Sequence, residues 1–417
     1  MKNYKVIVAH PGKQHSFRLA KALKNEGYLF KYITTIYDKE DSLLMKILKK
    51  VLGKSNLKRA NSRKCDFLKD EEVVQFSVLQ GLFLLLLVRI DKSRKIYNWL
   101  NNQIADNFGK KVASYAIENN VDAVILYDTN ATKCFEILKK KSPNIKRILD
   151  ASIANRLFTK QIYEEDFRVA KEISYEGKQN LKEIIKNEKK LLEEVKNSEY
   201  FLVPSHFVEK SYMYSGVTKT QIFKVPYGVN LNDIEEKDDV SELKNELNFL
   251  FVGQVSYRKG CHYLLEAFSK ISESNITLTM VGNIESEYLF RKYKKQENIK
   301  FLGRITFDKM KDIYQKSDVF IFPSLAEGMS LACLEALGMG LPIICTENSG
   351  VSEHIINEKN GFIINVCSVN EILEKIEWFI NNKNKINKMK KEAKNTVKDL
   401  TWESYEKNII TFLKKIL

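Results

Sequence analysis

The chain has 417 residues, of which 44% are hydrophobic and 11% aromatic, so it can bury full cores and is not expected to be disordered. Its length favours two or three domains. The net charge of +15 would suit a nucleic-acid partner, but we find no RNP motif, zinc finger or helix-turn-helix pattern, so we expect no nucleic-acid binding.

Short apolar segments alternate with longer helical patterns along most of the chain. This alternation is typical of parallel sheets with crossover helices. In the first half we predict strands at Val6–Ala9, Leu29–Thr34, Ala123–Tyr127, Arg147–Asp150, Tyr200–Pro204 and Ile222–Val225. In the second half we predict strands at Phe249–Gly253, Thr277–Gly282, Lys300–Leu302, Val319–Phe322 and Pro342–Cys345. We therefore predict an α/β fold with two Rossmann-like, doubly wound parallel sheets that face a crevice.

The chain begins with the strand-like Val6–Ala9, so we expect no signal peptide. The six cysteines are scattered, with no Cys-x-x-Cys pair, which favours a reduced cytoplasmic compartment.

Residues 230–244 are acidic and lack an apolar period, so we place an interdomain linker there. The predicted domains are 1–229 and 230–400.

Two segments of the first half raise the question of a membrane. The apolar run Gly81–Val88 is much shorter than the roughly 20 residues of a membrane span, so we predict a buried helix. The stretch Met45–Cys65 carries eight Lys or Arg residues and no acid, beside leucines and isoleucines at helical spacing. It is either a helix lying on an anionic membrane surface or a solvated helix face.

A further polar helix is predicted at Gly177–Asn197, from Lys and Glu at i, i+4 spacing.

The first segment with binding chemistry follows the strand that ends at Gly253. Its loop presents Arg258 and Lys259 just before a helix. Arginine can bind a diphosphate with two parallel hydrogen bonds, and lysine adds a point charge. Two exposed loop cations without a ligand remain the simpler interpretation of this loop taken alone.

The second segment places Glu327 on a loop and Glu335 in the second turn of the following apolar helix. Gly328 forms the turn between them, and the helix begins near Ser330. Free backbone amides at the start of a helix bind phosphate, and carboxylates accept hydrogen bonds from hydroxyls. This arrangement is suited to a nucleotide-sugar.

The third segment is the loop between the first strand and the first helix, with His10, Gly12 and His15. Gly12 would allow a ligand to approach the backbone. The two histidines are candidates for acceptor contact.

With these residues in place, the chain resembles the glycosyltransferase family 4 enzymes, which are group 1 retaining glycosyltransferases of GT-B fold. The likeness is strongest from Ser198 to Gly361. The matching motifs, in order, are Val203-Pro204-Ser205, Val225-Pro226-Tyr227-Gly228-Val229-Asn230, Val252-Gly253 through Arg258-Lys259-Gly260, Phe301-Leu302-Gly303-Arg304, the Glu327–Glu335 segment, Gly350-Val351-Ser352-Glu353 and Asn360-Gly361-Phe362. The helix beginning at Trp402 resembles the last helix of the family, so residues 401–417 are expected to pack back on the first domain.

The resemblance implies that domain 1–229 binds the acceptor and domain 230–400 the nucleotide-sugar, and it implies a role for each motif. Glu327 is expected to contact the hydroxyls of the donor sugar and Glu335 the ribose, while Arg258 and Lys259 stabilise the diphosphate. Backbone amides of the Glu327–Glu335 segment would hold sugar and phosphate, and the loops after two further strands would hold the base. The donor-binding residues implied are Gly12, Gly253, Asn283, Gly303, Arg304, Ile305, Gly328, Met329, Ser330 and Leu331. No Asp-x-Asp motif occurs, so neither a metal nor another cofactor is implied.

One feature departs from the family. Many members carry a histidine in the middle of the first domain that contacts the donor sugar, and the corresponding loops of this chain have none. Asp128 or Asp150 could take a polar role there, and the sequence does not choose between them.

The sequence therefore predicts a retaining, metal-independent glycosyltransferase. Its donor would be a nucleoside-diphosphate-sugar, and its acceptor a saccharide or lipid-linked saccharide of cell-surface polysaccharide synthesis. We expect it in the cytoplasm, peripheral to the inner face of the membrane if the 45–65 stretch contacts lipid. The alternative is a non-catalytic GT-B subunit that binds a partner glycosyltransferase or glycan. A sugar-nucleotide epimerase of the same fold matches the motifs less well.

Overall fold

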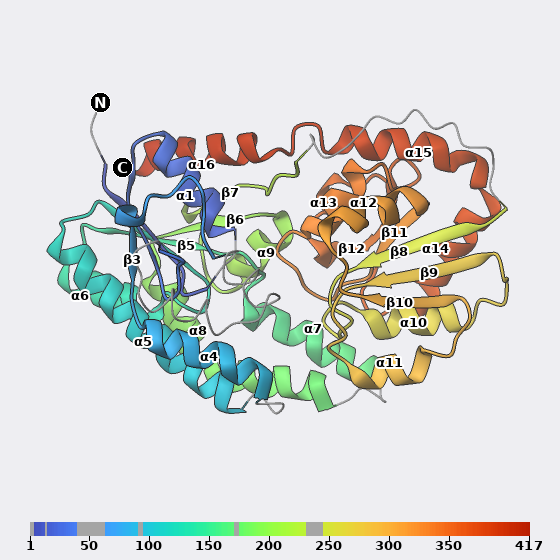
Figure 1. The fold of residues 1–417 in the computed structure, drawn as a ribbon, viewed down its shortest axis with the longest axis horizontal. Coiled ribbons are helices and arrows are strands. Elements are labelled where there is room, and N and C mark those ends of the chain that lie inside the picture. The colour runs from blue at the N-terminus through green and yellow to red at the C-terminus, as the bar shows by residue number, and fades with distance from the viewer. Residues whose placement is uncertain (1–3, 13–14, 40–62, 91–94, 171–174, 231–244) are drawn as a thin grey trace.

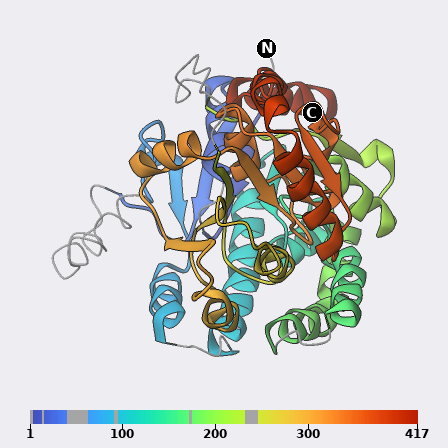
Figure 2. The ribbon, with the colours of Figure 1, turned by 90° about the vertical axis from the view of Figure 1, so that its right-hand side faces the viewer.

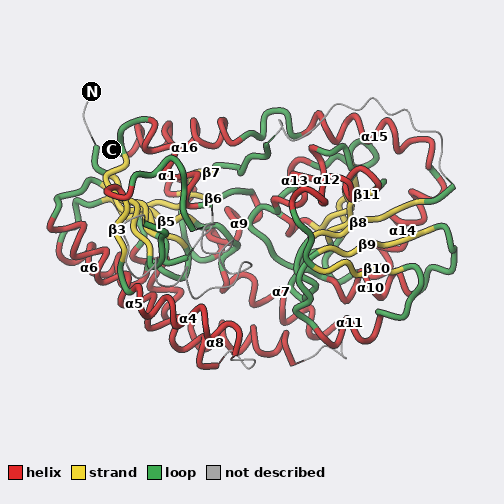
Figure 3. Tube along the Cα trace, in the orientation of Figure 1, coloured by secondary structure: helices red, strands yellow, loops and turns green. Residues whose placement is uncertain are grey.

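The computed structural model describes residues 4–12, 15–39, 63–90, 95–170, 175–230 and 245–417. They form two parallel sheets that lie side by side in Figure 1, the first in blue to green and the second in yellow to orange. Figure 3 shows the same separation, with helices around each group of strands. In Figure 2 the second sheet faces the viewer and the first half lies behind it.

The first sheet has the strand order β3-β2-β1-β4-β5-β6-β7, and every neighbouring pair is parallel. Its strands are β1 Val6–Ala9, β2 Leu29–Thr34, β3 Val73–Gln75, β4 Ala123–Tyr127, β5 Lys146–Asp150, β6 Tyr200–Val203 and β7 Ile222–Lys224. The helices of this half are α1 Ser16–Asn25, α4 Val78–Ile90, α5 Lys95–Glu118, α6 Thr132–Lys141, α7 Arg156–Val169, α8 Tyr175–Asn197 and α9 His206–Tyr214, with short 3-10 turns at Asp70–Glu72 and Lys219–Gln221.

The second sheet has the order β10-β9-β8-β11-β12-β13, again all parallel. Its strands are β8 Leu247–Val252, β9 Ile276–Val281, β10 Ile299–Gly303, β11 Val319–Phe322, β12 Ile343–Thr346 and β13 Gly361–Ile364. The helices are α10 Cys261–Ser269, α11 Glu287–Tyr293, α12 Phe307–Lys316, α13 Leu331–Gly338, α14 Val369–Asn381, α15 Lys383–Thr396 and α16 Trp402–Ile416, with 3-10 turns at Glu347–Ser349 and Ser352–His354.

Burial on both faces explains why the strands are almost entirely apolar. Along β4, Ile125 packs into one core cluster and Val124 into the other, and both side chains are fully buried. Helices α1 and α16 cover the first of these faces, and α5 and α6 cover the second. A parallel strand enclosed in this way needs apolar residues at every position rather than at alternate ones. The continuous apolar runs of the sequence have this cause.

All the predicted strands occur, with ends within two residues of those predicted. Two strands, β3 and β13, were not predicted. β3 is only three residues long and lies at the edge of its sheet, so it leaves no periodic pattern. β13 begins with Gly361, a residue that disfavours strands. Glycine is needed there because a Cβ would lie 2.1 Å from the carbonyl oxygen of Ile343 on the neighbouring strand.

The prediction of a buried helix at Gly81–Val88 is only partly correct. The helix exists as α4, and Gly81 and Leu87 are buried. Phe83, however, is 52% exposed and Leu85 is 39% exposed, because one side of α4 has no covering element among the described residues. Within the same residues, no helix combines the length and apolar character needed to cross a membrane. Most of the basic stretch, 45–62, and most of the predicted linker, 231–244, lie outside the described residues.

The chain passes between the two halves twice, and the two passages touch. Val229 donates its N–H to the carbonyl of Leu400 at 2.9 Å. A Cβ on Gly228 would lie 2.2 Å from the backbone of Thr401, so only glycine fits at this crossing. Helix α16 follows directly and packs on α1, where Glu406 pairs with Lys21 at 3.2 Å. The last helix of the chain therefore lies on the first half of the molecule.

Candidate functional site

The two cations predicted after β8 lie against Glu327, which belongs to the loop after β11. One carboxylate oxygen of Glu327 is 2.5 Å from both the Arg258 guanidinium and the Lys259 ammonium. The Ser324 hydroxyl donates to the same oxygen at 3.1 Å. The Lys259 ammonium also lies 4.8 Å from the centre of the Phe322 ring. The parallel sheet brings these residues together, because β8 and β11 are neighbours and end at the same edge.

This cluster is largely enclosed, and its charges depend on one another. Burial alone would raise the pKa of Glu327, but the charges of Arg258 and Lys259 outweigh burial and lower it. Burial lowers the pKa of Lys259, and Glu327 only partly compensates. The cluster holds two positive charges against one negative charge. A second anion would therefore complete its charge balance.

Close backbone contacts fix the loops around this cluster. Gly260 has φ +66°, and a Cβ there would lie 1.9 Å from the carbonyl oxygen of Pro323. Gly282, after β9, has φ +140°, and a Cβ there would lie 1.8 Å from the carbonyl oxygen of Gly253. Both positions therefore require glycine. The ends of β8, β9 and β11 are held against one another by these contacts.

The start of α13 presents backbone amides at the same edge. Ser330 caps the helix, and its hydroxyl accepts from the N–H of Cys333. Among the described residues, no acceptor pairs with the amides of Gly328, Met329, Leu331 or Ala332. Unpaired amides in the first turn carry the positive end of the helix dipole. Amides of this kind can bind an anion, and these lie at the same sheet edge as Arg258 and Lys259.

Glu335 lies one turn further along α13. It is exposed, and the Tyr314 hydroxyl donates to its carboxylate at 3.2 Å. Burial, followed by the charge of Glu335, raises the pKa of Tyr314 well above its ordinary value, so the phenol keeps its proton and donates. A carboxylate oriented in this way retains lone pairs for a ligand hydroxyl.

The residues expected to hold a base lie at the ends of β9 and β10. Asn283 and Arg304 are exposed, and Ile305 is half-buried. Gly282 donates its N–H to the carbonyl of Gly303 at 2.8 Å, which keeps these two loops adjacent. The three predicted side chains therefore border the same edge as Glu327.

In the first half, the histidines after β1 are engaged with neighbours. The N–H of Gly12 donates to Nδ1 of His10 at 2.9 Å, so the ring of His10 carries its proton on Nε2. Burial lowers the pKa of His10 to about 4, which makes it neutral near pH 7. His15 lies 3.0 Å from the carboxylate of Asp150, at the end of β5, and packs 4.5 Å from the ring of Tyr227.

Asp128 belongs to the loop after β4. The Ser152 hydroxyl donates to its carboxylate at 2.6 Å, and burial raises its pKa. The same loop is held from behind by Glu194 of α8, whose buried carboxylate accepts from the N–H groups of Thr129 and Ala131 at 2.8 Å. Burial, opposed by these hydrogen bonds, raises the pKa of Glu194 to about 7.

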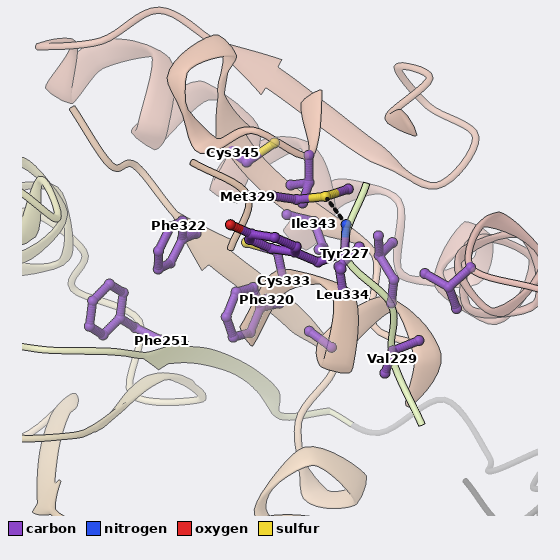
Figure 4. Packing of buried hydrophobic residues seen from close by; sticks show 14 of the residues in the cluster. Tyr227, Val229, Phe251, Phe320, Phe322, Met329, Cys333, Leu334, Ile343 and Cys345 are labelled. Atoms are coloured by element: carbon purple, nitrogen blue, oxygen red, sulfur yellow. Dashed lines mark hydrogen bonds between the residues drawn. The ribbon is translucent and has the colours of Figure 1, made fainter. Parts of the chain in front are cut away.

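The two edges meet at Gly328. A Cβ on Gly328 would lie 1.8 Å from the carbonyl oxygen of Ser152, and its own carbonyl accepts from the Ser205 hydroxyl at 2.6 Å. Beside it, the N–H of Tyr227 donates to the sulfur of Met329 at 3.3 Å, as the dashed line in Figure 4 shows. Met329 is therefore occupied by this contact between the halves. The Met329 side chain is buried in the core cluster that also holds Phe320 and Cys333.

The structure thus brings most predicted residues to two facing strand edges. Glu327, Arg258, Lys259 and the start of α13 form one group, and His10, Gly12, His15, Asp128 and Asp150 lie at the edge of the other sheet. Sequence reasoning missed Ser324, Tyr314 and Glu194, which orient these residues. Tyr314 and Glu194 reach their partners from separate elements, so spacing could not have revealed them, whereas Ser324 lies three residues before Glu327 in the same loop. Among the described residues, no group of three or more His, Cys, Asp or Glu side chains is placed to hold a metal ion.

The second half of the chain resembles known glycosyltransferases in sequence. The family model described as glycosyl transferases group 1 matches residues 233–396, which include the whole second sheet. A capsular polysaccharide biosynthesis glycosyltransferase of Staphylococcus aureus is 29% identical over 200 residues, which cover 44% of this chain and 51% of that protein. The UDP-Gal:alpha-D-GlcNAc-diphosphoundecaprenol alpha-1,3-galactosyltransferase of Escherichia coli is 31% identical over 178 residues, which cover 40% of this chain and 45% of that protein. The matched segment therefore spans about half the length of these relatives.

The fold extends over the whole chain. The structure of sucrose-phosphate synthase from Thermosynechococcus elongatus superposes with a TM-score of 0.68 at 17% identity and covers 99% of both chains. The chain thus has the GT-B fold throughout, and its second half carries the group 1 glycosyltransferase region.

Proposed function

We propose that the protein is a retaining, metal-independent glycosyltransferase of the family 4 type (EC 2.4). It would move a sugar from a nucleoside-diphosphate-sugar to a hydroxyl of a saccharide or lipid-linked acceptor. The observation that carries this proposal is the cluster of Arg258, Lys259 and Glu327 beside the unpaired amides of α13. It offers positive charge for a diphosphate and carboxylate oxygens for hydroxyls at one strand edge.

In this proposal, the second half binds the donor. Lys259, Arg258 and the amides of Leu331 and Ala332 would hold the diphosphate and stabilise the negative charge that grows on it as the sugar departs. Glu327 would turn from the two cations toward sugar hydroxyls, and Glu335 would accept from the ribose. Their effect on rate would come from charge stabilisation rather than from proton transfer, and no cofactor is needed for these steps.

The acceptor would enter from the first half and attack on the face from which the diphosphate leaves. His15, paired with Asp150, and Asp128, bonded to Ser152, are the polar groups at that edge. The relatives named for capsular polysaccharide synthesis and for a diphosphoundecaprenol-linked acceptor favour a place in cell-surface polysaccharide synthesis. With such an acceptor, we propose a cytoplasmic location, with 45–65 touching the inner face of the membrane.

The test is donor hydrolysis and transfer across a panel of nucleotide-sugars, with wild type and variants. Lys259→Ala should lower kcat by about a hundredfold or more, because it removes one cation from the leaving group. Glu335→Gln should mainly raise the donor KM. Glu287→Gln, an exposed glutamate of α11, is the matched control and should leave both constants unchanged. Unchanged turnover and donor binding in both site variants would show that the site assignment is wrong.

The competing proposal is a non-catalytic GT-B subunit. It is favoured by the engagement of both aspartates in the first half and by the lack of a histidine in their loops. Thermal-shift measurements with nucleoside diphosphates separate the two proposals. Stabilisation by at least one nucleoside diphosphate, lost in Lys259→Ala, favours the enzyme, and no stabilisation by any favours the subunit.

A further inference from the structure

A polar cavity of about 140 Å³ lies in the first half, between α5 and α8 and the loop after β4. Its wall includes Asn98, Asn101 and Asn102 from α5, Thr129 from the loop and Arg156 from the first turn of α7. We propose that this cavity is a subsite for one uncharged sugar unit of the acceptor. The inference rests on the proposed function and names where its acceptor is held.

The asparagines form a continuous amide surface. Positions 98, 101 and 102 are spaced i, i+3 and i+4, so they share one face of α5. Asn98 donates to the Glu183 carboxylate at 2.9 Å, which orients its amide. Within the part of the chain that the structure describes, Asn101, Asn102 and Arg156 have no hydrogen-bond or ion-pair partner. Their donors and acceptors are therefore available to a ligand in the cavity.

The chemistry of this wall selects hydroxyl groups. An amide side chain offers both donors and an acceptor, and a sugar hydroxyl both donates and accepts. Either group can therefore be the donor when the two form a hydrogen bond. The cationic Lys190 that also lines the cavity is paired with Asp106 at 2.7 Å. Among the described residues of the wall, Arg156 and the Glu183 carboxylate are the two charges without an ion-pair partner, and the negative charge of Glu183 further disfavours an anion in the cavity. A single guanidinium suits a hydroxyl or ring oxygen and is a weak site for a phosphate group, which normally takes several cations.

The cavity wall includes a strained residue. Thr129 has φ +71°, a conformation that a β-branched residue rarely adopts. It is held there because its N–H donates to the buried Glu194, which also bonds Ala131. Strain of this kind persists where the surrounding structure imposes it, and it concentrates at functional sites. Here it turns the Thr129 side chain into the wall of the cavity.

The cavity is also close to the donor site. Thr129 follows Asp128, which is bonded to Ser152, and the carbonyl of Ser152 touches Gly328. This series of contacts links the cavity wall to the loop that carries Glu327. A larger cavity, of about 250 Å³, includes Val121 and Lys146 in its wall, at the opposite edge of the first sheet, and is too remote to hold an acceptor.

The test uses the full-length protein and two readouts. Saturation-transfer NMR measures binding of methyl α-D-glucopyranoside, methyl α-D-galactopyranoside and methyl N-acetyl-α-D-glucosaminide, and steady-state kinetics measure acceptor and donor KM. The variant is Asn101→Ala/Asn102→Ala, which favours helix and so should fold. The control is Asn384→Ala/Asn387→Ala, two exposed asparagines of α15. Two lost hydrogen bonds at roughly 1 kcal/mol each should raise the acceptor KM by about thirtyfold with donor KM unchanged.

Loss of the NMR signal in the cavity variant, with the control unchanged, supports the subsite. An acceptor KM within twofold of wild type, or no glycoside binding by wild type, overturns it. Failure of the proposed function is a different result, namely absence of donor hydrolysis and of transfer in wild type. In that case the NMR measurement still decides whether the cavity binds a sugar.

Discussion

The carboxyl edges of the two sheets are built in different ways. In the second half, backbone approaches backbone so closely that Gly260 and Gly282 cannot carry a Cβ. In the first half, the edge is held by side chains that pair across strands, such as His15 with Asp150. We call the edge of the second sheet the backbone-built edge, because its close backbone contacts require glycine at positions that are visible in the sequence. We call the edge of the first sheet the side-chain-built edge. There the sequence shows the residues, but their spacing does not show which residue each one pairs with. This difference explains why the glycines of the second edge stand out in the sequence, whereas the pairs of the first edge do not.

The largest expected effect tests the backbone-built edge. Gly260 and Gly303 share φ +66°, but only Gly260 is crowded, since nothing lies within 4 Å of a Cβ on Gly303. Gly303→Ala should lower the free energy of unfolding by about 1 kcal/mol, the cost of the left-handed conformation. Gly260→Ala should lower it by roughly 3 kcal/mol or more, because the clash with Pro323 is added. Urea unfolding followed by circular dichroism measures both, and equal losses would show that backbone contact does not fix this edge.

The next prediction tests the side-chain-built edge through its pH dependence. Burial lowers the pKa of His10 from 6.5 to about 4. The unfolded chain therefore binds a proton between pH 6.5 and pH 4 while the folded chain does not, so stability is lost on acidification. The loss through this group should reach about 3 kcal/mol at pH 4. His15 and Asp150 also act on His10, with opposite signs.

His10→Asn supplies the matched comparison. Its carbonyl oxygen can replace Nδ1 as the acceptor for the Gly12 N–H, but it does not titrate. The free energy of unfolding of the wild type minus that of the variant should fall by about 3 kcal/mol from pH 7 to pH 4, because only the wild type loses stability through this group. Parallel curves over this range would mean that His10 is not held neutral at this edge.

The same contrast shows how much the sequence could predict. The apolar runs predicted eleven of the thirteen described strands, because parallel strands buried on both faces must be apolar throughout, but they missed β3 and β13. Arg258, Lys259 and Glu327 were identified as one binding region, since neighbouring parallel strands end at one edge. Their direct pairing through a single carboxylate oxygen was not predicted, because it depends on loop conformation. The support of the β4 loop by Glu194 was missed for a related reason: α8 reaches it from 62 to 65 residues away.

The smallest expected effect is at Thr129, where a residue of the side-chain-built edge adopts a backbone conformation typical of glycine. Thr129→Gly should raise the free energy of unfolding by about 1 kcal/mol, because relief of the left-handed strain exceeds the added chain entropy. Thr129→Asn tolerates the same conformation without that entropy and should stabilise at least as much. Both variants keep the N–H that donates to Glu194. Thermal unfolding at fixed pH measures the change.

If Thr129 is strained because it shapes the acceptor cavity, these variants should be more stable but less active than the wild type. The gain in stability should then accompany a rise in acceptor KM, since a stabilising change at a functional residue commonly costs activity. A variant that is both more stable and equally active would show that the strain serves only the fold. A variant that is less stable would show that the Thr129 side chain holds the β4 loop in place, as glycines do at the opposite edge.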